Sequence, residues 1–139
     1  MSIAYFDTSA IIKLIRIELN SESLRAWLGA PGRGSLAWVS SALVLTEVPR
    51  ALRRILPGSS LPDFASVLGR FTLRNLDEEI LVQAGAYAEP SLRSLDAIHL
   101  STARSIAADA GDEFDALITY DRRLADAAKA GGLSVVAPT

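Results

Sequence analysis

The chain opens with Ile3-Ala4-Tyr5-Phe6-Asp7-Thr8-Ser9-Ala10, an apolar run that ends abruptly in an aspartate and two hydroxyl residues. The run shows no polar alternation, which predicts a strand buried on both faces, as in a parallel sheet. The apolar spacing that follows, from about Ser9 to Arg16, predicts a helix. Asp7 is therefore expected at the carboxyl end of a strand, the edge at which open α/β sheets bind ligands. The alternative is that Asp7, Thr8 or Ser9 only caps the helix.

The composition indicates one globular domain that spans residues 1–139. Hydrophobic residues make up 50% of the chain and charged residues 22%, which suits a domain with a core of its own. The absence of cysteine and the single histidine exclude a thiolate site and a multi-histidine zinc site within one chain. A metal here would have to be held by oxygen ligands, which points to Mg²⁺ or Mn²⁺.

Charge and hydropathy limit the kinds of surface and segment that the protein can have. The net charge is -2, from 14 basic and 16 acidic residues, so any surface that binds nucleic acid must be a local patch. No charged leader precedes the first strand, and no apolar run approaches the length of about 18 residues that a membrane span needs. A cytoplasmic protein without a membrane segment is therefore expected.

Strand-like and helix-like segments alternate along the rest of the chain. Buried strands are predicted at residues 36–39, 72–76, 116–119 and 133–136, and helices at residues 22–28, 42–55, 63–70, 78–88, 95–109 and 122–130. This alternation predicts an α/β fold in which helices cover both faces of a parallel sheet. Pro49 lacks the N–H that a helix interior requires, so a kink or a split is expected near residues 46–48. Ser94 is expected to cap helix 95–109, with Asp96 in its first turn.

Four acidic residues occupy positions that such a fold brings to one edge. Asp7 and Asp121 each follow a strand, Asp96 opens a helix, and Glu47 lies on the helix after the second strand. Strand carboxyl ends and helix amino ends share one edge of a parallel sheet, so these side chains are expected to converge. Clustered carboxylates repel one another unless a hard divalent cation lies among them, and such a cation can activate water for phosphoryl displacement. The alternatives, taken singly, are a helix-capping role for Asp96 and a solvated surface position for Glu47.

Two nearby polar residues have less specific interpretations. His99 lies three residues after Asp96 on the same helical face, and is interpreted as a packed or hydrogen-bonded histidine rather than as a metal ligand. Thr119 either donates a hydrogen bond to a carboxylate or simply ends its strand.

The segments that carry these acids resemble the successive signatures of a PIN domain. They are Tyr5-Phe6-Asp7-Thr8-Ser9-Ala10, Thr46-Glu47, Ser94-Leu95-Asp96-Ala97-Ile98-His99-Leu100 and Thr119-Tyr120-Asp121-Arg122-Arg123-Leu124. The similarity spans nearly the whole chain and is closest to the VapC-type toxins of bacterial toxin–antitoxin pairs. It implies a PIN-like three-layer α/β fold with a central parallel sheet of four to five strands flanked by helices. It also implies a Mg²⁺-dependent endoribonuclease that cleaves structured cellular RNA, a cognate VapB-type antitoxin and a homodimer.

The resemblance also implies roles for single positions. The acidic quartet of the family, expected to be catalytic and to bind the metal, corresponds to Asp7, Glu47, Asp96 and Asp121. Thr8 and Thr119 match the hydroxyl positions beside the first and last acids, and are expected to contact the substrate. Pro49 departs from the family, which usually has an uninterrupted helix there. A distortion of the helix at Pro49 would change how far the side chain of Glu47 extends toward the other acids.

Arginines are expected to give the acidic pocket a basic rim. Glu47, Arg50 and Arg54 are spaced i, i+3, i+7 and would share one face of an unbroken helix, and Arg122 follows Asp121 directly. These arginines are candidates for contacts with RNA phosphates. The alternative is a solvated helix face with a Glu47–Arg50 ion pair.

Two other functions stay open on the sequence. A receiver-like signalling domain also binds Mg²⁺ in an acidic pocket, although the paired early acids and the late lysine of such domains are missing here. The second is a PIN domain that binds RNA or a partner without cutting. An antitoxin or a second copy would need apolar surface, which is expected on the helical faces bearing Leu14, Ile15, Trp27, Leu43 and Leu52.

Overall fold

The computed structural model describes residues 1–58 and 64–139 of the chain. Its elements follow one another in the order β1 (Ile3–Phe6), α1 (Thr8–Ile15), α2 (Ser21–Leu28), β2 (Ala37–Ser41), α3 (Val44–Ile55), α4 (Ala65–Leu68), β3 (Thr72–Arg74), α5 (Glu78–Ala86), α6 (Ser94–Ala110), η1 (Gly111–Glu113), β4 (Phe114–Ile118), α7 (Arg122–Ala130) and β5 (Val135–Val136). The predicted alternation of strands and helices is confirmed.

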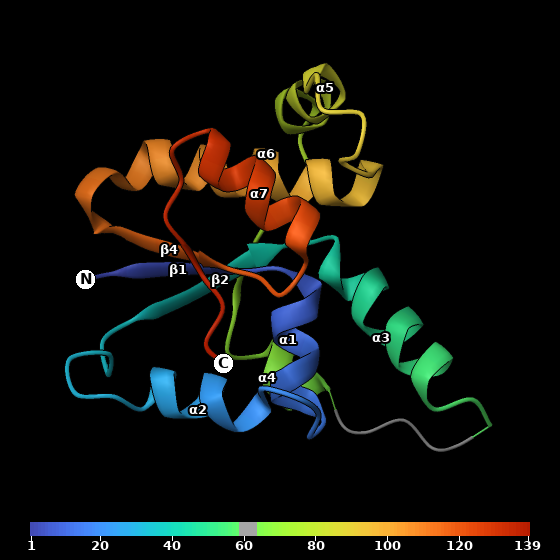
Figure 1. Cartoon of the computed structure of the whole chain (residues 1–139), viewed down its shortest axis with the longest axis vertical. Helices are drawn as coiled ribbons and strands as arrows, with labels where there is room; N and C mark the ends of the chain where they lie inside the picture. The colour runs from blue at the N-terminus through green and yellow to red at the C-terminus, as the bar shows by residue number, and fades with distance from the viewer. Residues whose placement is uncertain (59–63) are drawn as a thin grey trace.

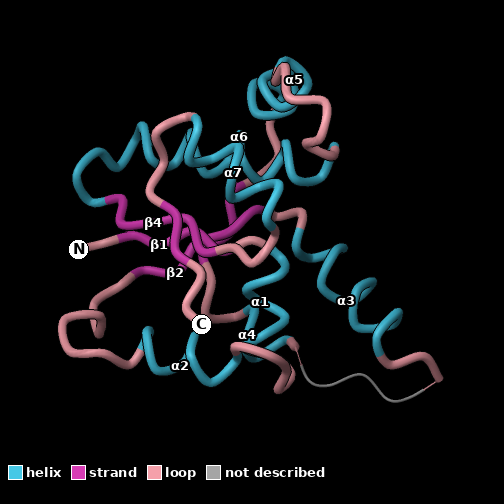
Figure 2. Tube along the Cα trace, viewed as in Figure 1, coloured by secondary structure: helices cyan, strands magenta, loops and turns pink. Residues whose placement is uncertain are grey.

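Within the described residues, five parallel strands form one sheet in the order β3-β2-β1-β4-β5. Figure 2 shows the strands in magenta, with helices in cyan around them. β1 takes the middle position because its residues are apolar throughout, and Ala4, Tyr5 and Phe6 are fully buried. Phe6 lies beside Ile118 of β4, and the N–H of Asp7 donates to the Ile118 carbonyl. The carboxyl ends of β1 and β4 are therefore adjacent. The predicted fold, with its central parallel sheet flanked by helices, is confirmed.

Helices cover both faces of the sheet. In Figure 1, α6 and α7 lie above the strands, and α1, α2 and α4 lie below them. β1 contributes to both cores, because successive side chains of a strand point to opposite faces. Phe6 packs in the cluster that contains Ile11 of α1, whereas Tyr5 packs in the cluster that contains Leu100 of α6. The hydroxyl of Tyr5 is thereby directed toward α6.

α3 runs through Pro49 as one helix, so the predicted split at residues 46–48 is wrong. The proline removes one hydrogen bond, to the carbonyl of Leu45, but Leu45 is 57% exposed and water can reach it. Val48 and Leu52 flank the proline and are fully buried in the core, which holds the helix in place. Glu47 keeps its position in the first turn of a continuous helix.

Several helices begin one or two residues away from the expected position, among them α6 and α4. Ser94 is the first residue of α6 and not its cap, since the N-cap is Arg93, which makes no side-chain capping hydrogen bond. Asp96 lies in the first turn as predicted. α4 covers only Ala65–Leu68, and Asp63, where that helix was expected to begin, lies outside the described residues.

Part of the apolar surface expected for a partner belongs to the core. Leu52 is fully buried. Leu14, Ile15 and Trp27 are partly buried and pack against a buried cluster, and α1 contacts both α2 and α3. The prediction is therefore wrong for Leu52, and for the other residues it stays a prediction. Large exposed apolar side chains lie instead at Ile17, Leu19, Leu45, Ile55, Leu81, Val82 and Leu95.

Candidate active site

One cavity of about 400 Å³ brings the four predicted acids together. It lies at the carboxyl edge of the sheet, where β1 ends and where α1, α6 and α7 begin. Its lining consists of Asp7, Thr8, Ser9, Glu47, Arg54, Arg93, Ser94, Leu95, Asp96, His99 and Asp121. Four segments that are far apart in the chain thus meet, as the order of the elements predicted.

Asp7 is buried, and its neighbours hold both of its oxygens. Oδ1 accepts hydrogen bonds from the Ser9 hydroxyl at 2.7 Å and the Ala10 N–H at 3.0 Å, and Oδ2 accepts one from Thr119 at 2.5 Å. The bond from Ala10 caps α1, so Asp7 does act as a cap, but the same residue also lines the cavity. Burial raises the pKa of Asp7, against the opposing effects of His99 and of these hydrogen bonds.

Two hydroxyl side chains tie the ends of β1 and β4 together. Thr119 donates to Asp7 and accepts from the N–H of Asp121 at 3.1 Å. Ser9 donates to Asp7 and accepts from the N–H of Tyr120 at 2.9 Å. Each hydroxyl is used as a donor and an acceptor at once, so the two acids are placed relative to each other by hydrogen bonds. The substrate contact expected of Thr119 stays a prediction.

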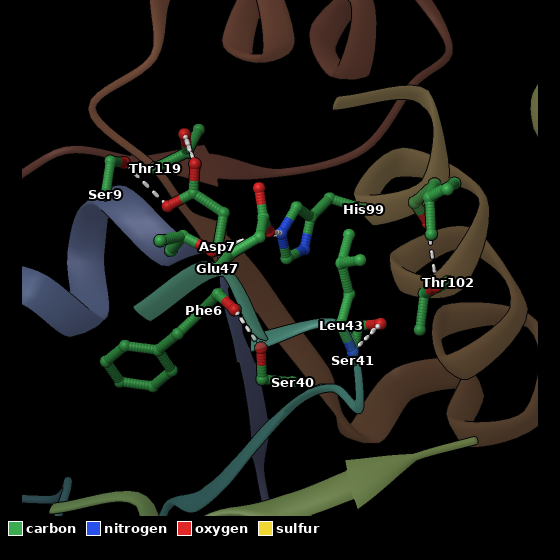
Figure 3. A network of polar contacts seen from close by, with 12 residues as sticks. Phe6, Asp7, Ser9, Ser40, Ser41, Leu43, Glu47, His99, Thr102 and Thr119 are labelled. Carbon is green, nitrogen blue, oxygen red and sulfur yellow. Dashed lines mark hydrogen bonds and ion pairs between the residues drawn. The ribbon is translucent and has the colours of Figure 1, made fainter. Parts of the chain in front are cut away.

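Glu47 is held by a series of contacts that begins in the core of the sheet. Its Oε1 accepts from the Thr8 hydroxyl at 2.7 Å. The same oxygen lies 2.6 Å from Nε2 of His99, a contact that Figure 3 shows. Nδ1 of His99 lies 2.7 Å from the hydroxyl of Tyr5. His99 is thus a buried, hydrogen-bonded histidine, as its sequence position indicated. In the described parts of the chain no ion pair joins Glu47 to Arg50, so the ion pair of that alternative is wrong.

The two remaining acids differ in how firmly they are held. Asp121 caps α7, since its Oδ1 accepts from the N–H of Leu124 at 3.1 Å. Asp96 makes no hydrogen bond or ion pair with the residues that the structure describes. Because the N-cap of α6 is Arg93, Asp96 is not a capping acid either. Its carboxylate is free to bind a ligand in the cavity.

Burial and mutual repulsion set the ionisation of the cavity. Burial, and after it the charges of Asp121 and Asp7, raise the pKa of Asp96 to about 6. Burial acts on Glu47 in the same direction, but the hydrogen bonds from His99 and Thr8, together with electrostatic attraction to His99 and Arg54, outweigh it and hold the pKa of Glu47 below its ordinary value. The cavity carries excess negative charge at neutral pH, which a bound cation would offset.

The donor set of the cavity suits a hard divalent cation. All four acids offer carboxylate oxygens, the ligands that Mg²⁺ and Mn²⁺ prefer. Asp96 and the Oε2 atom of Glu47 have no hydrogen-bond partner in the described chain. Among residues 1–58 and 64–139, no three acidic or histidine side chains already form a compact coordination sphere. This is the arrangement expected of carboxylates that repel one another and turn toward nearby donors.

Two arginines line the cavity, and sequence reasoning found only one of them. Arg54 of α3 is there, as its i, i+7 spacing from Glu47 predicted, whereas Arg93 was missed. The signal for Arg93 was its position directly before the helix that carries Asp96. Neither arginine forms an ion pair with an acid of the described chain, so both cations are available to a phosphate. Arg50 and Arg122 are exposed and lie outside the lining.

Proteins of similar sequence are ribonucleases. The PIN domain profile matches residues 4–130. Ribonuclease VapC35 of Mycobacterium tuberculosis is 48% identical over 134 residues, which cover 96% of each chain. Ribonuclease VapC46 of the same organism is 41% identical over 140 residues, the whole of both chains. The crystal structure of Mycobacterium tuberculosis VapC20, a toxin that cleaves the sarcin-ricin loop, has a TM-score of 0.66 over 97% of this chain and 99% of that chain, at 16% identity.

These similarities exclude one of the functions that the sequence left open. The profile covers most of the chain and the relatives run its full length, which excludes the receiver-like signalling domain. The structural match is too distant in sequence to show more than the shared fold, but the sheet and its helices agree with it. The chain therefore belongs to the PIN domain family, and its relatives of matching length include VapC ribonucleases.

Proposed function

We propose that this VapC-type endoribonuclease toxin cleaves structured cellular RNA with Mg²⁺ or Mn²⁺, held by Asp7, Glu47, Asp96 and Asp121. The observation that supports the proposal is the convergence of these four acids on one cavity. When bound, the ion would activate water and offset the charge that develops on the scissile phosphate. The only histidine of the chain is engaged by Tyr5 and Glu47, so no free imidazole is left to serve as a base.

RNA cleavage measured with Mg²⁺, with Mn²⁺ and with EDTA tests this proposal. Cleavage is expected with either ion and should be lost in EDTA, because the acids alone cannot supply the positive charge. Equal cleavage in EDTA and in Mg²⁺ would contradict the metal-dependent mechanism. The predicted substrate contacts at Thr8, Thr119, Arg50, Arg54 and Arg122 are proposals of the same kind, and Arg54 has the strongest support because it lines the cavity.

The arginines of the cavity should hold RNA phosphates. Arg54→Ala combined with Arg93→Ala is expected to weaken RNA binding and to lower the slope of log K against log salt by about 1 for each lost phosphate contact. The matched control is Arg25→Ala with Arg104→Ala, two exposed arginines outside the cavity lining. Binding measured between low and moderate salt would count against this role if both pairs changed the slope equally.

We further propose that residues 1–139 are one PIN domain, that the protein is cytoplasmic and that it pairs with a VapB-type antitoxin. No helix within the described ranges has the length and hydropathy that a membrane crossing needs. The exposed apolar side chains on α3 and α5, Leu45, Ile55, Leu81 and Val82, provide surface for a second copy or for a partner.

A homodimer is the expected oligomeric state. Light scattering of the purified protein should give twice the chain mass of 14.8 kDa. Expression from its native operon should recover a small second protein bound to it. A monomer in light scattering, together with no bound small protein, would refute both partner proposals.

A further inference from the structure

Glu47 has two carboxylate oxygens, and the protein engages only one of them. Thr8 Oγ1 and His99 Nε2 both contact Oε1, at 2.7 Å and 2.6 Å. Oε2 receives no hydrogen bond from the residues that the structure describes. The side chain of Glu47 is only 17% exposed and lines the acidic cavity. Oε1 is thus held in place by two contacts, and Oε2 has no partner among the described residues.

We propose that Tyr5 and His99 are positioning residues, which pin Oε1 of Glu47 and thereby present Oε2 to a divalent cation in the cavity. The inference rests on the proposed function only in requiring that the cavity bind a cation. It assigns the histidine no part in proton transfer to or from RNA. His99 acts through Glu47, and Tyr5 acts through His99.

The direction of each hydrogen bond between Tyr5, His99 and Glu47 follows from the chemistry of the carboxylate. Glu47 must be a carboxylate in order to hold a divalent cation, and a carboxylate can only accept hydrogen bonds. Nε2 of His99 must therefore carry a proton. In the neutral imidazole Nδ1 is then an acceptor, and the Tyr5 hydroxyl is its donor.

This series of contacts begins in the central strand of the sheet. Tyr5 lies in the central strand, is fully buried, and meets the imidazole edge-on with the ring centroids 5.9 Å apart. His99 is itself only 2% exposed, on α6. Partners behind a metal-binding carboxylate fix its orientation and raise affinity for the ion. A contact of this kind explains how Glu47 can be held toward the cavity although its helix contains Pro49.

The single histidine allows a direct test of the hydrogen-bond direction. Because the chain has one histidine, the imidazole ¹H–¹⁵N NMR spectrum of the intact protein contains one ring system and needs no assignment. We expect a protonated Nε2 at neutral pH. A spectrum in which Nδ1 alone carries the proton would overturn the proposal, because Nε2 could then not donate to Glu47.

A double-mutant cycle on metal affinity tests the positioning role itself. Tyr5→Phe keeps the ring and removes the hydroxyl, and is expected to weaken Mn²⁺ binding about tenfold, as loss of an outer partner does. In a Glu47→Gln background the same change should have less than about a twofold effect, because the pinned carboxylate is already gone. Tyr87→Phe, the same chemical change in a residue outside the cavity, should have no effect in either background.

The double-mutant cycle distinguishes a positioning role of Tyr5 from a purely structural role. A structural role for Tyr5 would weaken Mn²⁺ binding by the same factor in both backgrounds, and that result would overturn the proposal. His99→Gln can keep an N–H near the place of Nε2, so it should bind Mn²⁺ more tightly than His99→Leu. Equal affinities of these two variants and the parent would also overturn it. These measurements use no RNA. The positioning role could therefore be refuted while metal-dependent RNA cleavage is observed, and RNA cleavage could be absent while the positioning role is supported.

Discussion

Asp96→Asn should lower metal-dependent RNA cleavage by about two to three orders of magnitude, the usual effect of losing one group that stabilises transition-state charge. The reason is that Asp96 makes no hydrogen bond or ion pair within the described chain, so its charge is available to a cation in the cavity. Asparagine keeps the shape of the side chain and removes the charge. The fold should be unaffected, because no described contact depends on that carboxylate.

Asp7→Asn should reduce cleavage to a similar degree. Its amide oxygen can still accept from Ser9 and Ala10, so α1 keeps its cap and the protein should fold. Asp115→Asn is the matched control, since Asp115 is exposed near the amino end of β4, at the opposite edge of the sheet. Initial rates with a defined RNA would measure all three. Near-parental rates for both Asp7→Asn and Asp96→Asn would remove the metal site from this cavity.

The second large effect concerns stability and its dependence on metal. In the absence of metal, Asp96→Asn should raise the melting temperature by a few degrees, because it removes a charge that Asp121 and Asp7 repel. Mg²⁺ binds the folded site and not the unfolded chain, so it should stabilise the parent protein. Mg²⁺ should raise the melting temperature of Asp96→Asn much less than that of the parent protein. Thermal melts with EDTA and with Mg²⁺ would measure both differences.

The pH dependence follows from the same repulsion. The pKa of Asp96 is about 6 in the folded protein against an ordinary value of 3.8, so the folded state binds more protons between these values. The free energy of unfolding without metal should therefore be largest near pH 4 and should fall as the pH rises through 6 toward neutral. Asp7 acts in the same direction, since its pKa is also raised. If Asp96→Asn melted lower than the parent in EDTA and gained as much from Mg²⁺, Asp96 would be a structural residue.

The positions of the acids could be predicted from the sequence because they follow from local rules. An apolar strand that ends at Asp7, and another that ends just before Asp121, place both residues at one edge of any parallel sheet. Asp96 was located by its place in the first turn of a helix. None of these inferences needed the identity of a distant neighbour.

Features that depend on distant neighbours could not be predicted in the same way. The contact between His99 and Glu47 joins residues 52 positions apart, and that between Tyr5 and His99 joins residues 94 apart. Pro49 was expected to kink or split its helix, but the helix is continuous, because the buried side chains of Val48 and Leu52 outweigh the loss of one hydrogen bond. Helical periodicity also does not reveal which face lies against another helix.

The most direct test of the acidic cavity as a ribonuclease centre is to map RNA ends after expression of the parent protein and of Asp96→Asn. With the parent, discrete new ends are expected at a few sites in structured RNA. These ends should carry 5′-phosphates, because attack by water breaks the bond from phosphorus to the 3′ oxygen and leaves a 3′-hydroxyl on the other fragment. With Asp96→Asn at equal abundance, these ends should be absent. The same ends from both proteins, or no new ends from either, would contradict the account.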